Sequence, residues 1–282
     1  MKTRVITSVF ITAIMLAVLI LSGTLVYPIT LSIIATVAVY EVLKVFGIQK
    51  KLVFSIPSYL VAALMPTLAY VMRAIMGRAE NEFIILLALI LFVLMIYMFA
   101  VAVFTKGAVS FSTFAAAFVM VFYITVAFSA LSILRTVSGD VIGFLYVGLV
   151  IIGAWISDVF AYFTGVLFGK HKLIPEVSPK KTVEGSVGAI VFTTLFMLLY
   201  GFIASLVTDV TPNYLVLAIS GPVLSVVGQI GDLFASVVKR ERGVKDYGTL
   251  MPGHGGIMDR FDSILAVSCA TMVIVLIFPP FV

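Results

Sequence analysis

The residues most able to do chemistry lie in one polar, charge-dense segment near the C-terminus, from Ser236 to Ser263. Glycines cluster there around a histidine, in the order Gly253, His254, Gly255 and Gly256. Glycines let backbone N–H groups approach a phosphate closely, as in other anion-binding turns. The segment is also basic; Lys239, Arg240 and Arg242 could simply contact anionic head groups of the inner leaflet, but that interpretation does not explain the glycines. The segment therefore predicts a site for a phosphorylated substrate.

Three aspartates of this segment supply hard oxygen ligands of the kind that Mg²⁺ prefers. Asp246 precedes the glycines, and Asp259 and Asp262 are three residues apart, on one face of a helix that starts there. Magnesium usually bridges carboxylates to substrate phosphates. Together these features predict phosphoryl or nucleotidyl transfer without a covalent protein nucleophile. Zinc at His254 is disfavoured, because the other histidine and the single cysteine supply no recognisable ligand spacing.

The rest of the chain is too apolar for a water-soluble domain. Of its 282 residues, 62% are apolar and 11% are charged, whereas a soluble domain carries about a quarter charged residues. Apolar stretches of about 18 residues or more recur along the whole length, which predicts an all-α polytopic membrane protein with about nine transmembrane helices. The expected spans are residues 4–22, 25–46, 53–73, 82–104, 108–134, 141–169, 186–206, 212–238 and 262–280.

Basic residues predict how the chain crosses the membrane. With the N-terminus in the cytoplasm, all 18 of them except Arg73, Arg78 and Arg135 fall on the cytoplasmic side, as the positive-inside rule requires. The C-terminus then lies outside. The two longest connections, 170–185 and 239–261, are both cytoplasmic, so we expect the active site to face the cytoplasm. The net charge of +5 would suggest a nucleic-acid partner in a soluble protein. Here the distribution of the charges matters more than their sum, and we expect no nucleic-acid partner.

Three acidic residues fall inside expected spans: Glu41, Asp158 and Asp232. An ionisable side chain at the centre of a membrane helix costs at least ~2.5 kcal/mol, which marks each as a functional candidate.

Polar residues follow a helical spacing in two of the spans. Gln229, Asp232, Ser236 and Lys239 share one helix face, which we interpret as the wall of a cavity open to the cytoplasm. The alternative is a hydrogen-bonding seam between helices. Asp158 begins a similar face in the sixth span, with small residues that allow close helix approach. We expect these two helices to line one site.

The connection before the seventh span also contains basic residues and a glycine. It runs from Ser178 through Lys180 and Lys181 to Gly185. The two lysines could simply obey the positive-inside rule. The Ser-Pro start and the glycine favour a shaped turn, so the lysines could instead face phosphates of the same substrate.

These motifs together resemble the phosphatidate cytidylyltransferases, also called CDP-diacylglycerol synthases. The resemblance rests on the glycines, lysines and aspartates of residues 236–262, and on residues 157–165 and 178–185. It is loose before residue 150. The departures are Ser157 where Asn is common, Tyr247 where a small residue is common, and Met251 where Leu or Ile is usual. None of them removes a charged or glycine position.

The resemblance implies the reaction of CTP with phosphatidate to give CDP-diacylglycerol and pyrophosphate, dependent on Mg²⁺, with a second, monovalent cation as a further expectation. Metal would be held by Asp232, Asp246 and Asp259. The catalytic set is Asp246, Asp259, Lys239, Arg260 and His254. Phosphates would be bound by Lys180, Lys181, Ser236, Arg240, Lys245, Gly253, Gly255 and Gly256. Asp158, Gln229 and Asp262 would line the cavity.

Two other function classes remain open at this point. A secondary transporter would use intramembrane acids as an ion path, but it predicts paired broken helices in related halves, and the sequence has no clear repeat. Another membrane nucleotidyl- or phosphotransferase would carry different aspartate-rich motifs. We expect residues 1–135 to form an N-terminal transmembrane region that supplies a homodimer interface, and residues 136–282 to form the catalytic region with membrane lipid around both.

Overall fold

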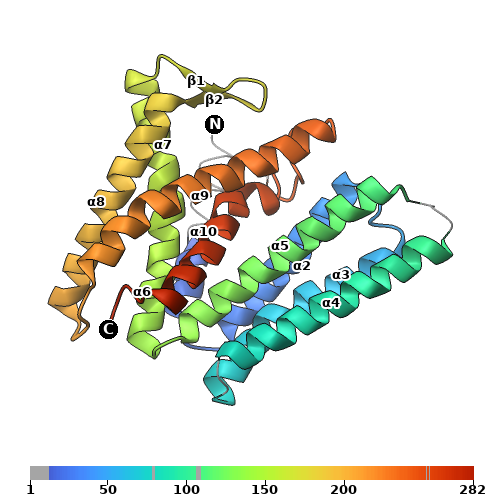
Figure 1. Ribbon diagram of the computed structural model, residues 1–282, viewed down its shortest axis with the longest axis horizontal. Coiled ribbons are helices and arrows are strands. Elements are labelled where there is room, and N and C mark those ends of the chain that lie inside the picture. The colour runs from blue at the N-terminus through green and yellow to red at the C-terminus, as the bar shows by residue number, and fades with distance from the viewer. Residues whose placement is uncertain (1–12, 78–79, 106–108, 252, 254) are drawn as a thin grey trace. The chain divides into compact units, whose positions relative to one another are not determined.

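The computed structural model describes residues 13–77, 80–105, 109–251, 253 and 255–282, and these residues fold almost entirely into helices (Figure 1). The helices are α2 (Val26–Val45), α3 (Leu52–Tyr70), α4 (Glu80–Phe104), α5 (Phe111–Thr136), α6 (Asp140–Ile151), α7 (Ser157–Phe168), α8 (Val183–Val207), α9 (Tyr214–Glu241) and α10 (Met258–Ile277). Two π-helical turns, η1 (Val71–Ile75) and η2 (Ile152–Ile156), extend α3 and join α6 to α7.

Within the described residues, eight helical segments are long and apolar enough to cross a membrane. They match the second to ninth expected spans, so the all-helical, polytopic fold class is confirmed. Residues 4–12 of the first expected span, 4–22, lie outside the described residues, and residues 13–20 are helical. The count of nine and the side on which each terminus lies stay predictions.

Large apolar side chains cover the outside of these helices. On α8, for example, Leu195, Leu199 and Leu206 are 53%, 49% and 68% exposed. In water such a surface would drive aggregation, whereas in lipid it is the expected outer face of a membrane helix.

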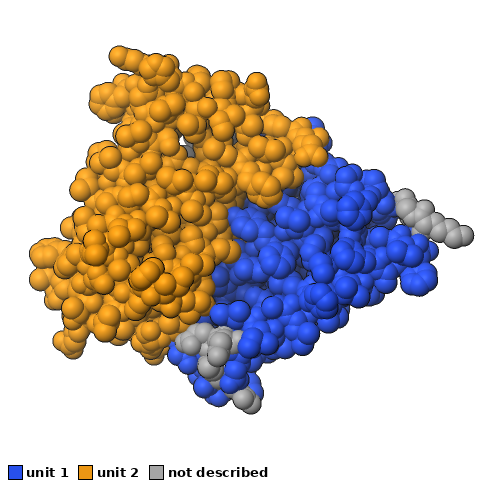
Figure 2. Space-filling view, in the orientation of Figure 1, with its two compact units in different colours: residues 1–136, 242–260 blue, residues 137–241, 261–282 orange. Residues whose placement is uncertain are grey.

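Contacts divide the chain into two compact units (Figure 2). The N-terminal unit comprises the described part of residues 1–136 together with Arg242–Arg260. The C-terminal unit comprises Val137–Glu241 and Phe261–Val282. The charge-dense segment found in the sequence therefore packs largely with the N-terminal unit, because its side chains and backbone contact α2.

The N-terminal unit is a bundle of α2, α3, α4 and α5. Alanines with no exposed surface, Ala35 and Ala38 on α2 and Ala62 on α3, allow the helices to pack closely. One polar contact inside the bundle joins two helices: Ser32 Oγ of α2 lies 2.8 Å from Thr67 Oγ1 of α3. Such a contact satisfies two hydroxyl groups where no water reaches them.

In the C-terminal unit, α8 packs against both α7 and α9. Between α7 and α8 the chain forms the only strand pair of the described residues, β1 (Lys172–Ile174) antiparallel to β2 (Ser178–Thr182). The sequence predicted a shaped turn here but no strands. The chain's last residues are held by the backbone of the α8–α9 connection, where Val282 and Thr211 exchange two hydrogen bonds of 2.8 and 3.1 Å.

Close packing of α8 and α9 depends on Gly221. A Cβ at this position would lie 2.5 Å from the Cα of Thr194, which is backbone and cannot move aside. We expect Gly221→Val to destabilise the protein by about 1–3 kcal/mol through overpacking. Thermal unfolding in detergent measures this as a lower midpoint. Val223→Ile, which adds one methylene at an exposed position of the same helix, is the control; equal midpoints for the two variants would contradict the packing account.

Candidate active site

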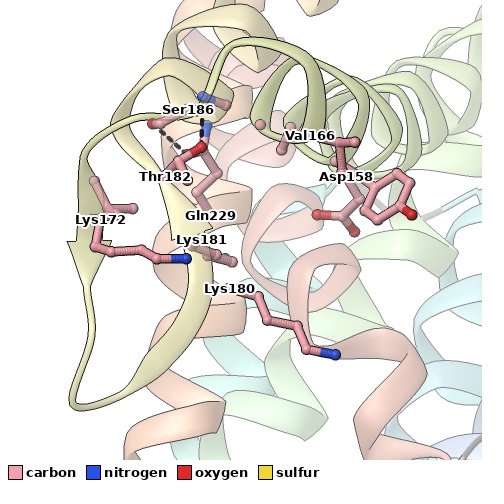
Figure 3. A pocket seen from close by; sticks show the side chains of 14 residues that line it. Asp158, Val166, Lys172, Lys180, Lys181, Thr182, Ser186 and Gln229 are labelled. Carbon is pink, nitrogen blue, oxygen red and sulfur yellow. Dashed lines mark hydrogen bonds between the residues drawn. The ribbon is translucent and has the colours of Figure 1, made fainter.

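A cavity of about 440 Å³ opens in the C-terminal unit beside the β1–β2 hairpin (Figure 3). Its lining combines cations from the hairpin, a carboxylate from α7 and an amide from α9, and it includes Lys172, Lys180, Lys181, Asp158 and Gln229. Apolar side chains of α7, among them Tyr162 and Val166, complete the wall. Polar and apolar surfaces therefore meet in one cavity, as binding of an amphiphilic molecule requires.

Thr182, the last residue of the hairpin, caps the N-terminus of α8 with its side chain. Thr182 Oγ1 accepts a hydrogen bond of 3.1 Å from the N–H of Gly185, and Thr182 has the extended backbone of an N-cap residue. Gly165 of α7 lies close enough that a Cβ there would be 2.9 Å from Thr182 Oγ1. The cap and the glycine together fix the start of α8 against α7, and with it the position of Lys181, the residue before Thr182.

Lys181 forms an ion pair across the cavity's edge. Its Nζ lies 2.5 Å from Oδ2 of Asp232 on α9, and both side chains are partly buried, with 21% and 29% exposed. The lysine is therefore held by a carboxylate that the sequence assigned to metal binding. An ion pair of this kind neutralises Asp232 where the surroundings are poor in water.

A second carboxyl lies beside this pair. Asp262 of α10 is 8% exposed, and it hydrogen-bonds to the Asp232 side chain and interacts electrostatically with Lys239. Two neighbouring carboxyls repel each other when both are ionised, so they need a cation or a shared proton between them. Asp262, expected only to line the cavity, is thus a direct neighbour of the candidate metal ligand Asp232.

Two further hydrogen bonds fix the residues around this carboxyl pair. Ser263 Oγ donates to Asp158 Oδ2 over 3.1 Å, which ties α10 to α7. Gln229 is held from both sides, because Ser186 Oγ donates to its Oε1 over 2.5 Å and its Nε2 donates to Ser225 Oγ over 3.2 Å. The alternative reading of the α9 face, a hydrogen-bonding seam, is therefore correct for Gln229, although this residue also lines the cavity.

In the N-terminal unit, the charge-dense segment folds around Asp259. The Oδ2 atom of this residue accepts hydrogen bonds from the N–H of Tyr247, 2.7 Å away, and of Gly256, 2.9 Å away. Asp259 is 9% exposed. It closes the loop that runs from Tyr247 to Gly256, and the N–H of Gly256, assigned to phosphate binding from the sequence, is directed to this carboxylate instead.

Other expected site residues lie at the surface of their own unit. Lys245, Asp246 and Gly253 are exposed in the loop, and Arg260 is exposed at the start of α10. Gly253 and Gly255 have φ angles of 79° and 82°, a backbone conformation that glycine adopts at low cost. In the C-terminal unit, Arg240 is exposed and Ser236 is half-buried. His254 lies outside the described residues.

Sequence reasoning missed the partners of Glu41. This α2 carboxylate accepts hydrogen bonds from the N–H groups of Ile257 and Met258, over 3.0 and 2.9 Å, within the N-terminal unit. The sequence marked Glu41 as a functional candidate by its place in a span. It gave no signal of the partners, which lie more than 200 residues away along the chain.

Among the described residues, no group of three or more His, Cys, Asp or Glu side chains is arranged to hold a metal ion. The donor chemistry nevertheless suits Mg²⁺, which commonly takes one or two carboxylates and completes its ligands with substrate phosphates and water. In the C-terminal unit, Asp232 and Asp262 are neighbouring carboxyls. The full metal set expected from the sequence, Asp232, Asp246 and Asp259, is divided between the two units.

Comparison with known proteins gives a consistent result over the whole chain. A model of the Cytidylyltransferase family matches residues 2–278. The chain is 35% identical to a phosphatidate cytidylyltransferase of Bacillus subtilis, covering 95% of this chain and 94% of that protein. It is 33% identical to the phosphatidate cytidylyltransferase of Staphylococcus haemolyticus, covering 95% and 96%. A match to the protein of the same name from Aquifex aeolicus reaches 42% identity over 43% of each chain.

The cap on α8 can be tested without any substrate. Thr182→Val keeps the shape of the side chain but removes the acceptor for the N–H of Gly185, so we expect a loss of about 1 kcal/mol of stability. Thr182→Ser keeps the acceptor and is the matched control. Both are compared with the unchanged protein by thermal unfolding in detergent; a valine variant as stable as the serine variant would show that the cap does not hold the hairpin.

Proposed function

Because this chain belongs to the cytidylyltransferase family, we propose that it is a phosphatidate cytidylyltransferase, which converts CTP and phosphatidate to CDP-diacylglycerol and pyrophosphate. The observation that carries the proposal is similarity along nearly the entire chain to proteins of that name, at 33–35% identity. A secondary transporter would leave this similarity unexplained. The same similarity supports cytidylyl transfer over other membrane phosphotransfer reactions.

The chemistry needs no nucleophile from the protein. A phosphate oxygen of phosphatidate attacks the α-phosphorus of CTP and forms the new P–O bond. The bond from the α-phosphorus to the bridging oxygen of the β-phosphate breaks, and its electrons leave with pyrophosphate. Since two polyanions must approach each other, the chief requirements are cations and orientation.

Residues of the C-terminal unit supply much of this charge. Lys172, Lys180 and Lys181 border the cavity beside the hairpin and can hold phosphate oxygens. The apolar wall on α7, where Tyr162 and Val166 are each 66% exposed, suits the adjoining glycerol and acyl groups of a lipid. We assign phosphatidate binding to this cavity on the combination of the two surfaces.

Residues of the N-terminal unit supply a second group of polar side chains. Lys245 and Arg260 are exposed cations that we assign to phosphate binding, and Asp246 is an exposed carboxylate in the same loop. Asp259 orders the loop through the N–H groups of Tyr247 and Gly256. His254 remains assigned to the catalytic set through the sequence motif alone.

We assign Mg²⁺ as the cofactor. In the C-terminal unit Asp232, with Asp262 as a neighbour, is the proposed ligand. In the N-terminal unit the sequence motif assigns Asp246 and Asp259 to metal binding. When bound, Mg²⁺ supplies positive charge that stabilises the leaving pyrophosphate. Lys181 pairs with Asp232 and would be free to turn toward a phosphate once a cation replaced it. A second, monovalent cation is part of the same proposal.

The proposed site faces the cytoplasm, where CTP is available, and this orientation rests on the distribution of the basic residues. Phosphatidate would enter from the surrounding lipid. Because one of its substrates lies in the bilayer, the enzyme is an integral membrane protein; in a prokaryote we assign it to the cell inner or plasma membrane.

Activity can be tested directly with purified protein, radiolabelled CTP, phosphatidate and Mg²⁺. We expect a labelled CDP-lipid and pyrophosphate in equal amounts, and no product when a polyprenyl phosphate replaces phosphatidate. Asp246→Ala and Asp259→Ala should each lower turnover by about 100-fold or more, as expected when a charge-stabilising group is lost. Asp209→Ala, at an exposed position of the α8–α9 connection, is the control. Near-full activity in both site variants would contradict the assignment of these aspartates.

Metal binding can be measured apart from turnover. Mg²⁺ at about 100 times its dissociation constant should stabilise the folded protein by about 2.7 kcal/mol, seen as a higher unfolding midpoint. Asp262→Asn and Asp232→Asn should each lose most of this shift, whereas Asp209→Asn removes the same charge and should keep it. If both site variants kept the full shift, the Asp232–Asp262 pair would not be part of the metal site.

A further inference from the structure

Glu41 is the most buried acidic side chain among those that the structure describes. It lies near the end of α2 and is 3% exposed. Its Oε1 accepts from the N–H of Ile257 and its Oε2 from the N–H of Met258. Met258 is the first residue of α10. The carboxylate therefore caps the start of α10 from a helix in a distant part of the sequence.

The interaction is favourable for two reasons. The first N–H groups of a helix have no partner within the helix, and the helix dipole places partial positive charge there. A carboxylate that accepts two N–H groups satisfies them with charge-assisted hydrogen bonds, which are stronger than neutral ones. An acid that would be costly in an apolar helix is thereby stabilised, and the start of α10 is fixed to α2.

Two glycines of the loop leave space that the Glu41 carboxylate occupies. A Cβ at Gly248 or at Gly256 would overlap the carboxyl group of Glu41. Neither glycine has a positive φ, so backbone conformation does not require glycine at these positions. Glycine is needed at both positions because a larger side chain would overlap the carboxyl group of Glu41. The loop is thus shaped around one side chain of α2.

The contacts of Glu41 lead directly to Asp259. Asp259 follows Met258, and it receives the N–H of Gly256, the residue before Ile257. The backbone on the N-terminal side of Asp259 is therefore fixed by Glu41 and by Asp259 itself. At the other end of the segment, the Arg242 guanidinium lies 4.3 Å from the ring centre of Phe46, the residue just after α2. The end of α2 thus contacts both ends of the segment.

We propose that Glu41 is a positioning residue for cytidylyl transfer: it holds the backbone of Ile257 and Met258 at the start of α10, so that Asp259 and Arg260 are presented in the productive geometry. This inference rests on the proposed function. Glu41 need not contact either substrate, because it acts through backbone N–H groups. A residue that only stabilised the fold would have a different signature, since its loss would lower the folded yield and leave the turnover of each folded molecule unchanged.

Glu41→Gln is the first variant. The amide keeps one acceptor oxygen but turns an NH₂ group toward an N–H donor, so one hydrogen bond and the charge are lost. We expect kcat per folded molecule to fall about 10-fold or more, and amide hydrogen exchange at Ile257 and Met258 to quicken by about 10-fold as the loop opens locally. Ser32→Ala, which breaks the buried Ser32–Thr67 hydrogen bond elsewhere on α2, is the matched control and should change neither quantity.

A double-mutant cycle tests the proposed contact through kcat per folded molecule. Gly248→Ala leaves Glu41 in place but pushes a methyl group against its carboxylate, and should lower kcat in the unchanged background. In the Glu41→Ala background the space is free, so Gly248→Ala should have almost no further effect. Independent effects would instead multiply, and the coupling between the two positions would be near zero.

The outcomes separate this inference from the proposed function. If the unchanged protein made no CDP-lipid, the function would be wrong, and the exchange measurement would still show whether Glu41 holds the loop. If the unchanged protein were active and Glu41→Gln kept kcat within twofold, the positioning role would be overturned. Unchanged exchange at Ile257 and Met258, or multiplicative effects in the cycle, would overturn it as well.

Discussion

A carboxylate or ammonium group surrounded by apolar helices is stable only when its partners come from the protein itself. This constraint explains where the polar chemistry of the chain is found. Lys181 pairs with Asp232, and Asp262 lies beside that pair. Glu41 caps the start of α10. Each buried charge is tied to another element, so the interactions that make the charges tolerable also fix the helices that carry the site.

The two compact units meet this constraint in different ways. In the C-terminal unit, side chains neutralise one another around a cavity, and the hairpin brings lysines to carboxylates of the membrane helices. In the N-terminal unit, backbone N–H groups donate hydrogen bonds to the carboxylates of Glu41 and Asp259. The first arrangement leaves lysines at the border of a cavity. The second joins the start of α10 to α2.

Much of the architecture could be predicted from the sequence because hydropathy reports directly on lipid exposure. The spans from residue 25 onward, the two long connections and the acidic residues inside the spans all follow from it. The helical spacing of Asp232 and Lys239 placed them on one face, and the structure shows both as neighbours of Asp262. The coarse chemistry was visible because charges are rare in this chain and their positions are informative.

Contacts between distant segments could not be predicted in this way. Spacing gave no indication that Glu41 meets Ile257 and Met258, because periodicity describes one helix at a time. For the same reason the glycines were interpreted through phosphate binding, whereas Gly248 and Gly256 leave room for Glu41 and Gly256 donates to Asp259. The strand pair was also missed, since its strands of 3 and 5 residues are too short to show an alternating pattern.

The proposed reaction transfers a cytidylyl group in a single direct displacement, with residues of this chain supplying charge and orientation but no covalent intermediate. The most direct test is the stereochemical course of the reaction with CTP that carries a chiral α-phosphorothioate. One in-line displacement inverts the configuration at the α-phosphorus, so the account predicts a CDP-lipid of inverted configuration. Retention would require two displacements through a covalent enzyme intermediate, and would contradict it.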